Sequence, residues 1–130
     1  MKQNNILSFL HNKLYVFAIT ALLMLVTSEI FAAQFIEVSE DSEHKVVISS
    51  YELNRIKIEG GRIEGFQALE GDLSAVSDQK KGELFVHLPQ KYSKKLTNIF
   101  LTSDSGATFK LLLVPKNIPS EQIFLIEGST

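Results

Sequence analysis

The 130-residue sequence contains no cysteine, no tryptophan and only three prolines. Without cysteine the chain has no disulfide bond and no thiol nucleophile, so a domain of this size must be stabilised by core packing or by its partners. The sequence also lacks a tract of clustered lysine and arginine. Nucleic-acid binding relies on such a tract to displace phosphate counterions, so direct DNA or RNA binding is not expected.

After residue 33, no segment shows the 3.6-residue apolar period of an amphipathic helix, and short alternating segments occur instead. RIKIE at 55–59 alternates two isoleucines with three charged residues, and ELFVHL at 83–88 alternates in the same way. Both segments are expected to be strands with one buried face. Further strands rich in Val, Ile, Phe and Thr are expected at 35–39, 45–49, 63–69, 96–102, 108–114 and 123–126.

Glycine-containing turns separate the expected strands, because glycine adopts positive φ angles at little cost. Gly60 and Gly61 join two strands, and a polar loop at 78–82 ends in glycine. Residues 103–106 (SDSG) are expected to close a hairpin. About eight short strands with a turn roughly every 8–12 residues predict an all-β fold, either a small β-sandwich or an open barrel.

Gly65 interrupts one of the strand patterns. A glycine inside a strand often marks a β-bulge, which shifts the following side chains to the other face. We therefore expect Phe66 and Leu69 to join Ile63 on the buried face.

The first 33 residues have the layout of a secretory signal peptide. Lys2 and Lys13 precede an apolar run at 14–26, and small residues follow at Ala32 and Ala33. A run of thirteen residues, with Thr20 as its only polar member, is shorter than the roughly 20 that a membrane-spanning helix needs, although an uncleaved anchor is the alternative. We predict a signal peptide at 1–33 and one β domain at 34–130.

Loss of this leader removes Lys2, Lys13 and Glu29, which takes the 13 basic and 15 acidic side chains to 11 and 14. A mildly acidic, exported domain without disulfides fits a bacterial periplasm better than an animal extracellular space. The predicted location is therefore the periplasm of a Gram-negative cell.

The predicted domain offers little for catalysis or metal binding. Its two histidines, His44 and His87, have no nucleophile motif beside them, and His87 fits an exposed position on a strand. The acidic segment 37–43 lacks the alternating ligands and central glycine of a calcium loop, so it is expected to be a solvated turn. We expect no catalytic residue, no metal and no cofactor.

Two further features have simple interpretations. Gly60–Gly61 is a poor phosphate cradle because no helix follows it. Lys91, Lys94 and Lys95 form a small basic cluster beside Tyr92. This cluster is interpreted as a solvated loop, with a contact to lipid headgroups or to an acidic partner as the alternative.

The C-terminal segment is a candidate for protein–protein contacts. In the strand expected at 108–114, Leu112 and Val114 make the second face apolar as well, so this strand needs cover on both sides. Pro115 is expected to end the strand, and an extended crossing then carries 123–126 elsewhere, as the last strand or as a strand for a neighbour. The predicted interaction residues are Leu112, Val114, Ile123, Phe124, Leu125 and Ile126.

Four segments, in order, resemble the TraK family of F-type conjugative type IV secretion systems. The first is QFIEV at 34–38, and the second is LNRI at 53–56 with Arg62-Ile63 close behind. The third is GELFV at 82–86, and the last is the block from FLT at 100–102 through Gly106 to LLLVPKNIP at 111–119. The likeness runs from about residue 34 to residue 126.

The resemblance implies a structural, secretin-like subunit of the outer-membrane core complex, which supports pilus assembly and DNA transfer. Its implied partners are a TraV-like lipoprotein, a TraB-like inner-membrane-anchored protein and further copies of itself in a ring peripheral to the outer membrane. Members of the family continue into a second β domain that is not present in these 130 residues. The runner-up hypothesis is a periplasmic module that binds peptides or glycans or acts as a chaperone, and an enzyme is a distant third.

Overall fold

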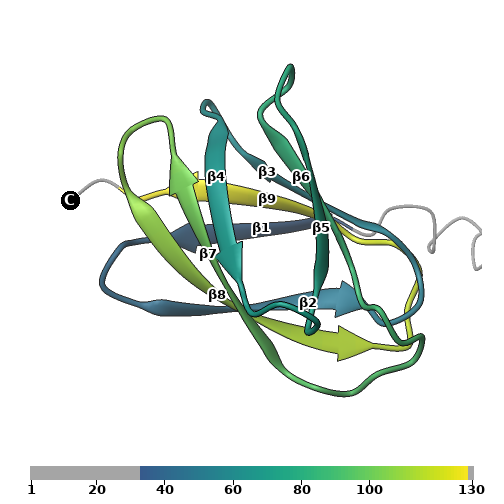
Figure 1. Cartoon of the computed structure of the whole chain (residues 1–130). Helices are drawn as coiled ribbons and strands as arrows, with labels where there is room; N and C mark the ends of the chain where they lie inside the picture. Colours follow the sequence, from purple (N-terminus) through teal and green to yellow (C-terminus); the bar gives the residue numbers. More distant parts are fainter. Residues whose placement is uncertain (1–32, 129–130) are drawn as a thin grey trace, which may run out of the picture. The chain divides into compact units, whose positions relative to one another are not determined.

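Nine strands and no helix form residues 33–128, the part of the chain that the computed structural model describes (Figure 1). The predicted signal peptide lies outside these residues except for Ala33, and the described part contains no helix able to cross a membrane. The strands are β1 (Ala33–Val38), β2 (Glu43–Ser49), β3 (Asn54–Ile58), β4 (Ile63–Ala68), β5 (Ser74–Asp78), β6 (Glu83–His87), β7 (Thr97–Ser103), β8 (Thr108–Lys116) and β9 (Gln122–Glu127).

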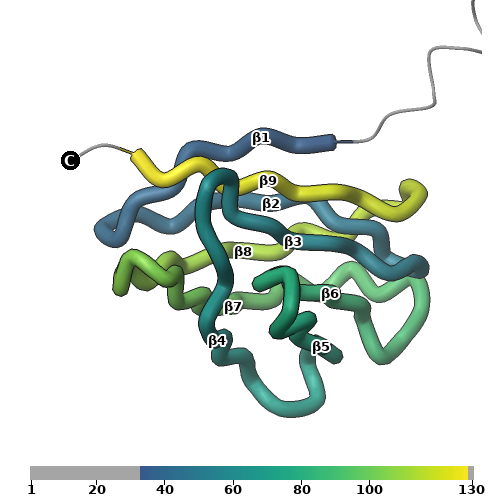
Figure 2. The backbone as a smooth tube through the Cα atoms, turned by 90° about the horizontal axis from the view of Figure 1, so that it is seen from above, coloured from purple at the N-terminus to yellow at the C-terminus, as the bar shows by residue number. Residues whose placement is uncertain are grey.

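The strands form two sheets, so the predicted β-sandwich is confirmed. The five-stranded sheet has the order β1-β9-β3-β6-β5, and the four-stranded sheet has the order β2-β8-β7-β4. Strand β9 runs parallel to both β1 and β3, and β2 runs parallel to β8, whereas the other pairs are antiparallel. Figure 2 shows β1 and β2 at one side of the molecule and β4 and β5 at the other.

The core lies between the sheets and is built from alternate residues of nearly every strand. Ile56 and Ile58 of β3 and Leu84 and Val86 of β6 are almost fully buried, as the alternating segments predict. Burying an aliphatic side chain of this size contributes about 1.5–3 kcal/mol. The other buried apolar residues are Val38, Val46, Ile48, Ile63, Leu73, Leu88, Ile99, Leu101, Phe109, Leu111, Leu113, Ile123 and Leu125.

A side chain joins the two sheets along the side formed by β1 and β2. The Gln34 amide donates to the Val47 carbonyl at 2.6 Å, and the Val47 N–H donates to Gln34 Oε1 at 3.1 Å. Gln34 Nε2 also donates to Glu121 at 2.9 Å. The amide thus satisfies backbone groups of β2 that would otherwise be free at the sheet edge.

The predicted turn at Ser103–Gly106 does close the hairpin of β7 and β8. Gly106 has φ +90°, the Gly106 N–H donates to the Ser103 carbonyl at 3.0 Å, and the Ser103 N–H donates to Ala107 at 2.9 Å. The bulge at Gly65 is also confirmed, because the register of β4 on β7 shifts between Ile63 and Gly65.

The bulge has only part of the predicted effect. Phe66 packs against the core, but Leu69 is 74% exposed, so its predicted burial is wrong. Strand β4 ends at Ala68, and Leu69 already belongs to the turn that leads towards β5. Strand β5 was not predicted, because its segment SAVSD has too little apolar alternation to indicate a strand.

The prediction that Pro115 ends its strand is wrong. Strand β8 continues to Lys116, and Pro115 is paired with Ile48 of β2. On the other side of β8, pairing with β7 stops at Leu113, so the position of Pro115 has only one neighbouring strand. A residue without an N–H is tolerated there because no ladder on that side needs its donor.

The predicted crossing after β8 is confirmed. Strand β9 belongs to the opposite sheet, where it lies between β1 and β3. It is therefore an interior strand of this domain, paired on both sides within the same chain. Because both edges of β9 are occupied, it is not a free strand for a neighbouring molecule.

Candidate interaction surface

Asn54, in the second of the motifs that carry the resemblance, forms hydrogen bonds that connect four segments of the chain. Its side chain is fully buried, and Oδ1 accepts from the Ser49 N–H at 2.8 Å and from the Glu121 N–H at 3.1 Å. Its Nδ2 donates to the carbonyls of Ser49, Glu52 and Val86 at 3.2–3.3 Å. One amide thus connects β2, β3, β6 and the start of β9, as a buried polar group with all its partners satisfied.

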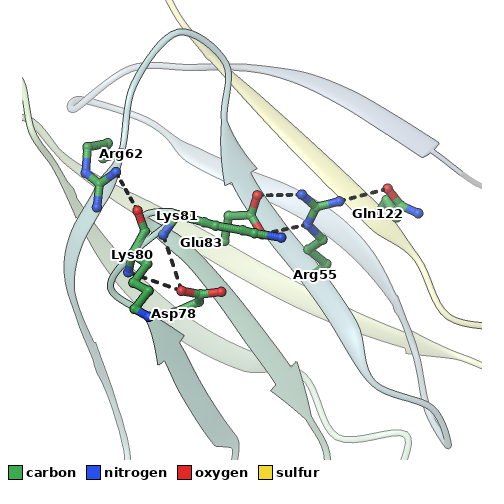
Figure 3. A network of polar contacts seen from close by, with 7 residues as sticks. All are labelled: Arg55, Arg62, Asp78, Lys80, Lys81, Glu83 and Gln122. Carbon is green, nitrogen blue, oxygen red and sulfur yellow. Dashed lines mark hydrogen bonds and ion pairs between the residues drawn. The ribbon is translucent and has the colours of Figure 1, made fainter.

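Arg55, the next residue, forms a two-point ion pair with Glu83 of β6 on the outer face of the five-stranded sheet (Figure 3). Arg55 Nε donates to Glu83 Oε2 at 2.9 Å, and Nη2 contacts the other carboxylate oxygen. Nη1 reaches Gln122 of β9 at 3.5 Å, so the guanidinium spans three adjacent strands. Paired, two-point hydrogen bonds of this kind are the strongest that a carboxylate forms.

The environment of Glu83 decides its charge. Its side chain is only 5% exposed, against 32% for Arg55. The hydrogen bonds from Arg55 hold the pKa of Glu83 below its ordinary value and outweigh the opposing effect of burial, and Lys81 and Lys57 act in the same direction. The same pair raises the pKa of Arg55. Glu83 is therefore a carboxylate under neutral conditions, which suits a structural ion pair and does not suit a general acid.

Arg62 and Gly82, which also belong to the motifs, form a tight joint between the two sheets. Gly82 has φ +69°, and a Cβ placed on it would lie 2.7 Å from the Cβ of Arg62. The Ile63 N–H donates to the Gly82 carbonyl at 2.8 Å, and Arg62 Nη1 donates to the Lys80 carbonyl at 3.1 Å (Figure 3). Only glycine fits this position, because both the backbone angle and the contact exclude a side chain.

These motif residues position strands, and no catalytic arrangement accompanies them in the described residues. His44 Nε2 lies 3.0 Å from the Ser39 N–H in a local turn, and His87 is exposed at the end of β6. Residues 33–128 contain no cluster of three or more His, Cys, Asp or Glu side chains that could hold a metal.

Several apolar side chains lie on the outer face of the four-stranded sheet. We call the group formed by Phe100, Leu112, Val114 and Leu69 the Phe100 face. Phe100 is 44% exposed. It lines two shallow hollows, of about 310 Å³ with Leu69 and about 380 Å³ with Thr102. Leu112 and Val114 of β8 are half-buried on the same face. Exposed apolar groups gathered on one sheet face are typical of protein contact sites.

The outer face of the five-stranded sheet has a second apolar group at its β1 edge. The rings of Phe35 and Phe124 stack with centroids 5.0 Å apart and planes at 16°. Phe35 is 67% exposed and Ile126 is 42% exposed. Because β1 pairs only with β9, its other edge has unpaired backbone groups beside these side chains.

The six predicted interaction residues divide between core and surface. Ile123 and Leu125 lie in the core, with at most 1% of their surface exposed, so they cannot contact another molecule directly while the domain is folded. Leu112 and Val114 lie on the Phe100 face, and Phe124 and Ile126 lie on the opposite sheet. That these four bind a partner stays a prediction.

Sequence reasoning did not single out Phe35 or Phe100 as surface residues. A signal was present for Phe100, because it alternates with Ile99 and Leu101, whose burial points the phenylalanine outward. Phe35 alternates similarly with partly buried Ile36 in β1. An aromatic residue on the outward half of a strand is informative because the domain core does not need it.

Together these features define a small β-sandwich whose polar motif residues fix the strands and whose apolar residues remain on both outer faces, as in a binding or scaffold domain. Residues 37–130 match the family model of the TraK N-terminal domain, so the chain belongs to this family. The match includes β2 to β9 in full. A search of curated proteins found no match. Members of the family are structural components of conjugative transfer, and the family is not a known enzyme family.

Proposed function

We propose that the chain is a structural subunit of the outer-membrane core complex of a conjugative type IV secretion system, where it supports pilus assembly and DNA transfer. The observation that carries this proposal is the match of residues 37–130 to the TraK N-terminal domain. We further propose that the protein is exported to the periplasm, associates with the outer membrane and forms a ring of identical subunits. Its proposed partners are a TraV-like lipoprotein and a TraB-like protein anchored in the inner membrane.

The surface of the domain supports a role in assembly. Residues 33–128 bury a core between the two sheets, yet Phe100 and Phe35 remain 44% and 67% exposed on opposite sheets. A subunit of a ring has neighbours on at least two sides, and two separate apolar surfaces meet that requirement. Phe100 is the better first target, because it lines both hollows on the outer face of the four-stranded sheet.

A conjugation assay tests this proposal. Donor cells that lack the gene are complemented with the wild-type chain or with Phe100→Asp, and the transfer frequency is measured. We expect the wild type to restore transfer and Phe100→Asp to lower it at least tenfold, because a charge at the centre of an apolar contact costs more than about 1.4 kcal/mol, a factor of ten in binding.

The matched control is Gln79→Asp, which adds the same charge at an exposed position of the loop between β5 and β6, outside the Phe100 face. Its transfer frequency should stay near that of the wild type. Immunoblots of the envelope fraction establish that all variants accumulate equally. Normal transfer in cells without the gene would contradict the proposed function, whereas normal transfer with Phe100→Asp would remove only the Phe100 face from it.

A further inference from the structure

One end of the sandwich has a hollow of about 410 Å³, which Pro115, Lys116 and Asn117 of the last motif line together with residues outside the motifs. It lies where the chain leaves β2 and β8, beside the loop between β6 and β7, and the arrowheads of β2 and β8 mark this end in Figure 1. Its polar lining comes from all three segments: Ser50, Ser93, Lys94, Lys116 and Asn117. The hollow therefore collects hydrogen-bonding groups that are distant in the sequence.

The charge in this hollow is positive and uncompensated. Lys94 and Lys116 both line it, and neither forms an ion pair with any carboxylate of residues 33–128. The neighbouring Lys95 differs, because its ammonium group is bound to Asp72 at 2.8 Å and lines an adjacent hollow. Two lysines without an ion-pair partner among the described residues, both lining one hollow, favour an anionic ligand.

The wall of the hollow is held in a strained backbone conformation. Tyr92 has φ +61° and is the only residue other than glycine with positive φ in the described part of the chain. Its N–H donates to the Ser50 carbonyl at 2.8 Å, and its ring lies against Tyr51 with centroids 5.4 Å apart. Even so, the Tyr92 side chain is 61% exposed. Strained residues of this kind concentrate at binding sites, where the strain fixes a side chain in position.

From these contacts we infer that the hollow binds a phosphate group. The ammonium groups of Lys94 and Lys116 supply the charge, and the Ser93 hydroxyl and the Asn117 amide donate to further phosphate oxygens. The exposed ring of Tyr92 packs against the organic part of the ligand. This site is separate from the proposed assembly surfaces, and its test does not depend on them.

A phosphate group could reach this site from two sources. Leu53, in the loop after β2, is 50% exposed at the same end of the sandwich, which fits a phospholipid headgroup at a membrane surface. A soluble phosphate ester is the other source. An acidic partner, one of the alternatives for the cluster of Lys91, Lys94 and Lys95, is a different class of ligand. A glutamate-rich peptide in the experiment below distinguishes it from a phosphate.

The experiment uses the isotope-labelled protein purified after export. One arm titrates glycerol 3-phosphate and follows the backbone amide resonances, and the other measures cosedimentation with phosphatidylglycerol vesicles and with phosphatidylcholine vesicles. We expect saturable shifts at Ser50, Ser93 and Asn117, or selective binding to the anionic vesicles. Lys94→Gln and Lys116→Gln should each weaken binding about fivefold, since each removes one charge contact, and high salt should weaken it further.

The matched control is Lys110→Gln, which removes a lysine of the four-stranded sheet that is already paired with Glu43 at 3.0 Å. Its binding should equal that of the wild type. Saturation in the first arm alone identifies a soluble ester, and selective vesicle binding identifies a lipid; either supports the site. The inference is overturned if neither probe binds, if the two lysine variants bind as well as the wild type, or if only a glutamate-rich peptide shifts these resonances.

Discussion

Replacement of Asn54 by alanine removes the side chain that joins β2, β3, β6 and the start of β9. Its Oδ1 accepts two backbone N–H groups, and its Nδ2 donates to three carbonyls. In Asn54→Ala, the N–H groups of Ser49 and Glu121 have no acceptor in a fully buried location. We therefore expect this single change to be among the most destabilising in the domain.

The loss of stability can be calculated from the two backbone N–H groups, of Ser49 and Glu121, that lose their acceptor. A buried donor without a partner costs about 1–3 kcal/mol, so the pair costs about 4 kcal/mol. A domain of about 100 residues has a total stability of about 5–15 kcal/mol, and its Tm falls by about 4–8 °C per kcal/mol. A loss of about 4 kcal/mol should therefore lower the Tm of Asn54→Ala by about 16–32 °C.

Thermal and urea unfolding of the exported protein, followed by circular dichroism, measure this loss. Asn98→Ala is the matched control, because Asn98 is exposed on β7 and its loss should change stability by less than about 0.5 kcal/mol. A fall in Tm of less than about 5 °C for Asn54→Ala, with an unchanged urea m-value, would refute the reasoning that this amide holds the strands together.

Asn54→Asp separates the acceptor role from the donor role. Aspartate keeps one oxygen for the two N–H groups but places its second oxygen against the carbonyls of Ser49, Glu52 and Val86. Burial and these carbonyls disfavour the charged form, so the folded-state pKa of the new carboxyl should rise. Because the folded-state pKa is raised, protonation in acid stabilises the folded variant, so the stability that Asn54→Asp loses relative to the wild type should decrease as the pH falls. A loss of stability that stays constant between neutral and acidic pH would contradict the donor role of the amide.

Two further predictions concern the other motif residues. Glu83→Gln should lower the free energy of unfolding by about 1.5–3 kcal/mol, because a neutral amide replaces the carboxylate that accepts from Arg55. The pKa of Glu83 is lowered in the folded protein, so its contribution to stability is present above its unfolded pKa of about 4.3 and is lost as the pH falls through the folded value. The urea midpoints of Glu83→Gln and the wild type should therefore converge in acid. A difference that stays constant with pH would contradict the pairing. Gly82→Ala should lower the free energy of unfolding by about 2 kcal/mol more than Gly60→Ala. Both glycines have a φ near +70°, but only a Cβ at position 82 would contact Arg62. Equal losses of Tm in the two variants would contradict this contact.

Local patterns in the sequence predict much of the fold. The alternation at 55–59 and 83–88 identifies the buried faces of β3 and β6, and glycine chemistry locates the β7–β8 turn and the β4 bulge. Strand β5 was missed because a short strand at the sheet edge, with exposed Val76, needs little apolar alternation. The parallel pairing of β1 with β9 joins residues about 90 positions apart, and no local pattern encodes such a contact.

The roles of the motif residues were less accessible from the sequence. Alternation correctly places Glu83 on the outer face of β6, but its burial depends on the Arg55 side chain of β3. That contact requires the register that pairs Arg55 with Phe85, which the sequence alone does not provide. Similarly, the sequence indicates only that Asn54 begins a strand. Its role in joining strands becomes evident from its hydrogen bonds to Ser49, Val86 and Glu121 in the folded domain.

We propose that this member of the TraK N-terminal domain family acts as an assembled subunit of a conjugation apparatus. The most direct test is affinity purification of the tagged chain from detergent-solubilised envelopes of conjugating cells, with mass spectrometry of the complex and its native mass. We predict several copies of the chain together with a TraV-like lipoprotein and a TraB-like protein. Recovery of a freely soluble monomer without either partner, from cells that transfer DNA normally when the gene is deleted, would contradict the account.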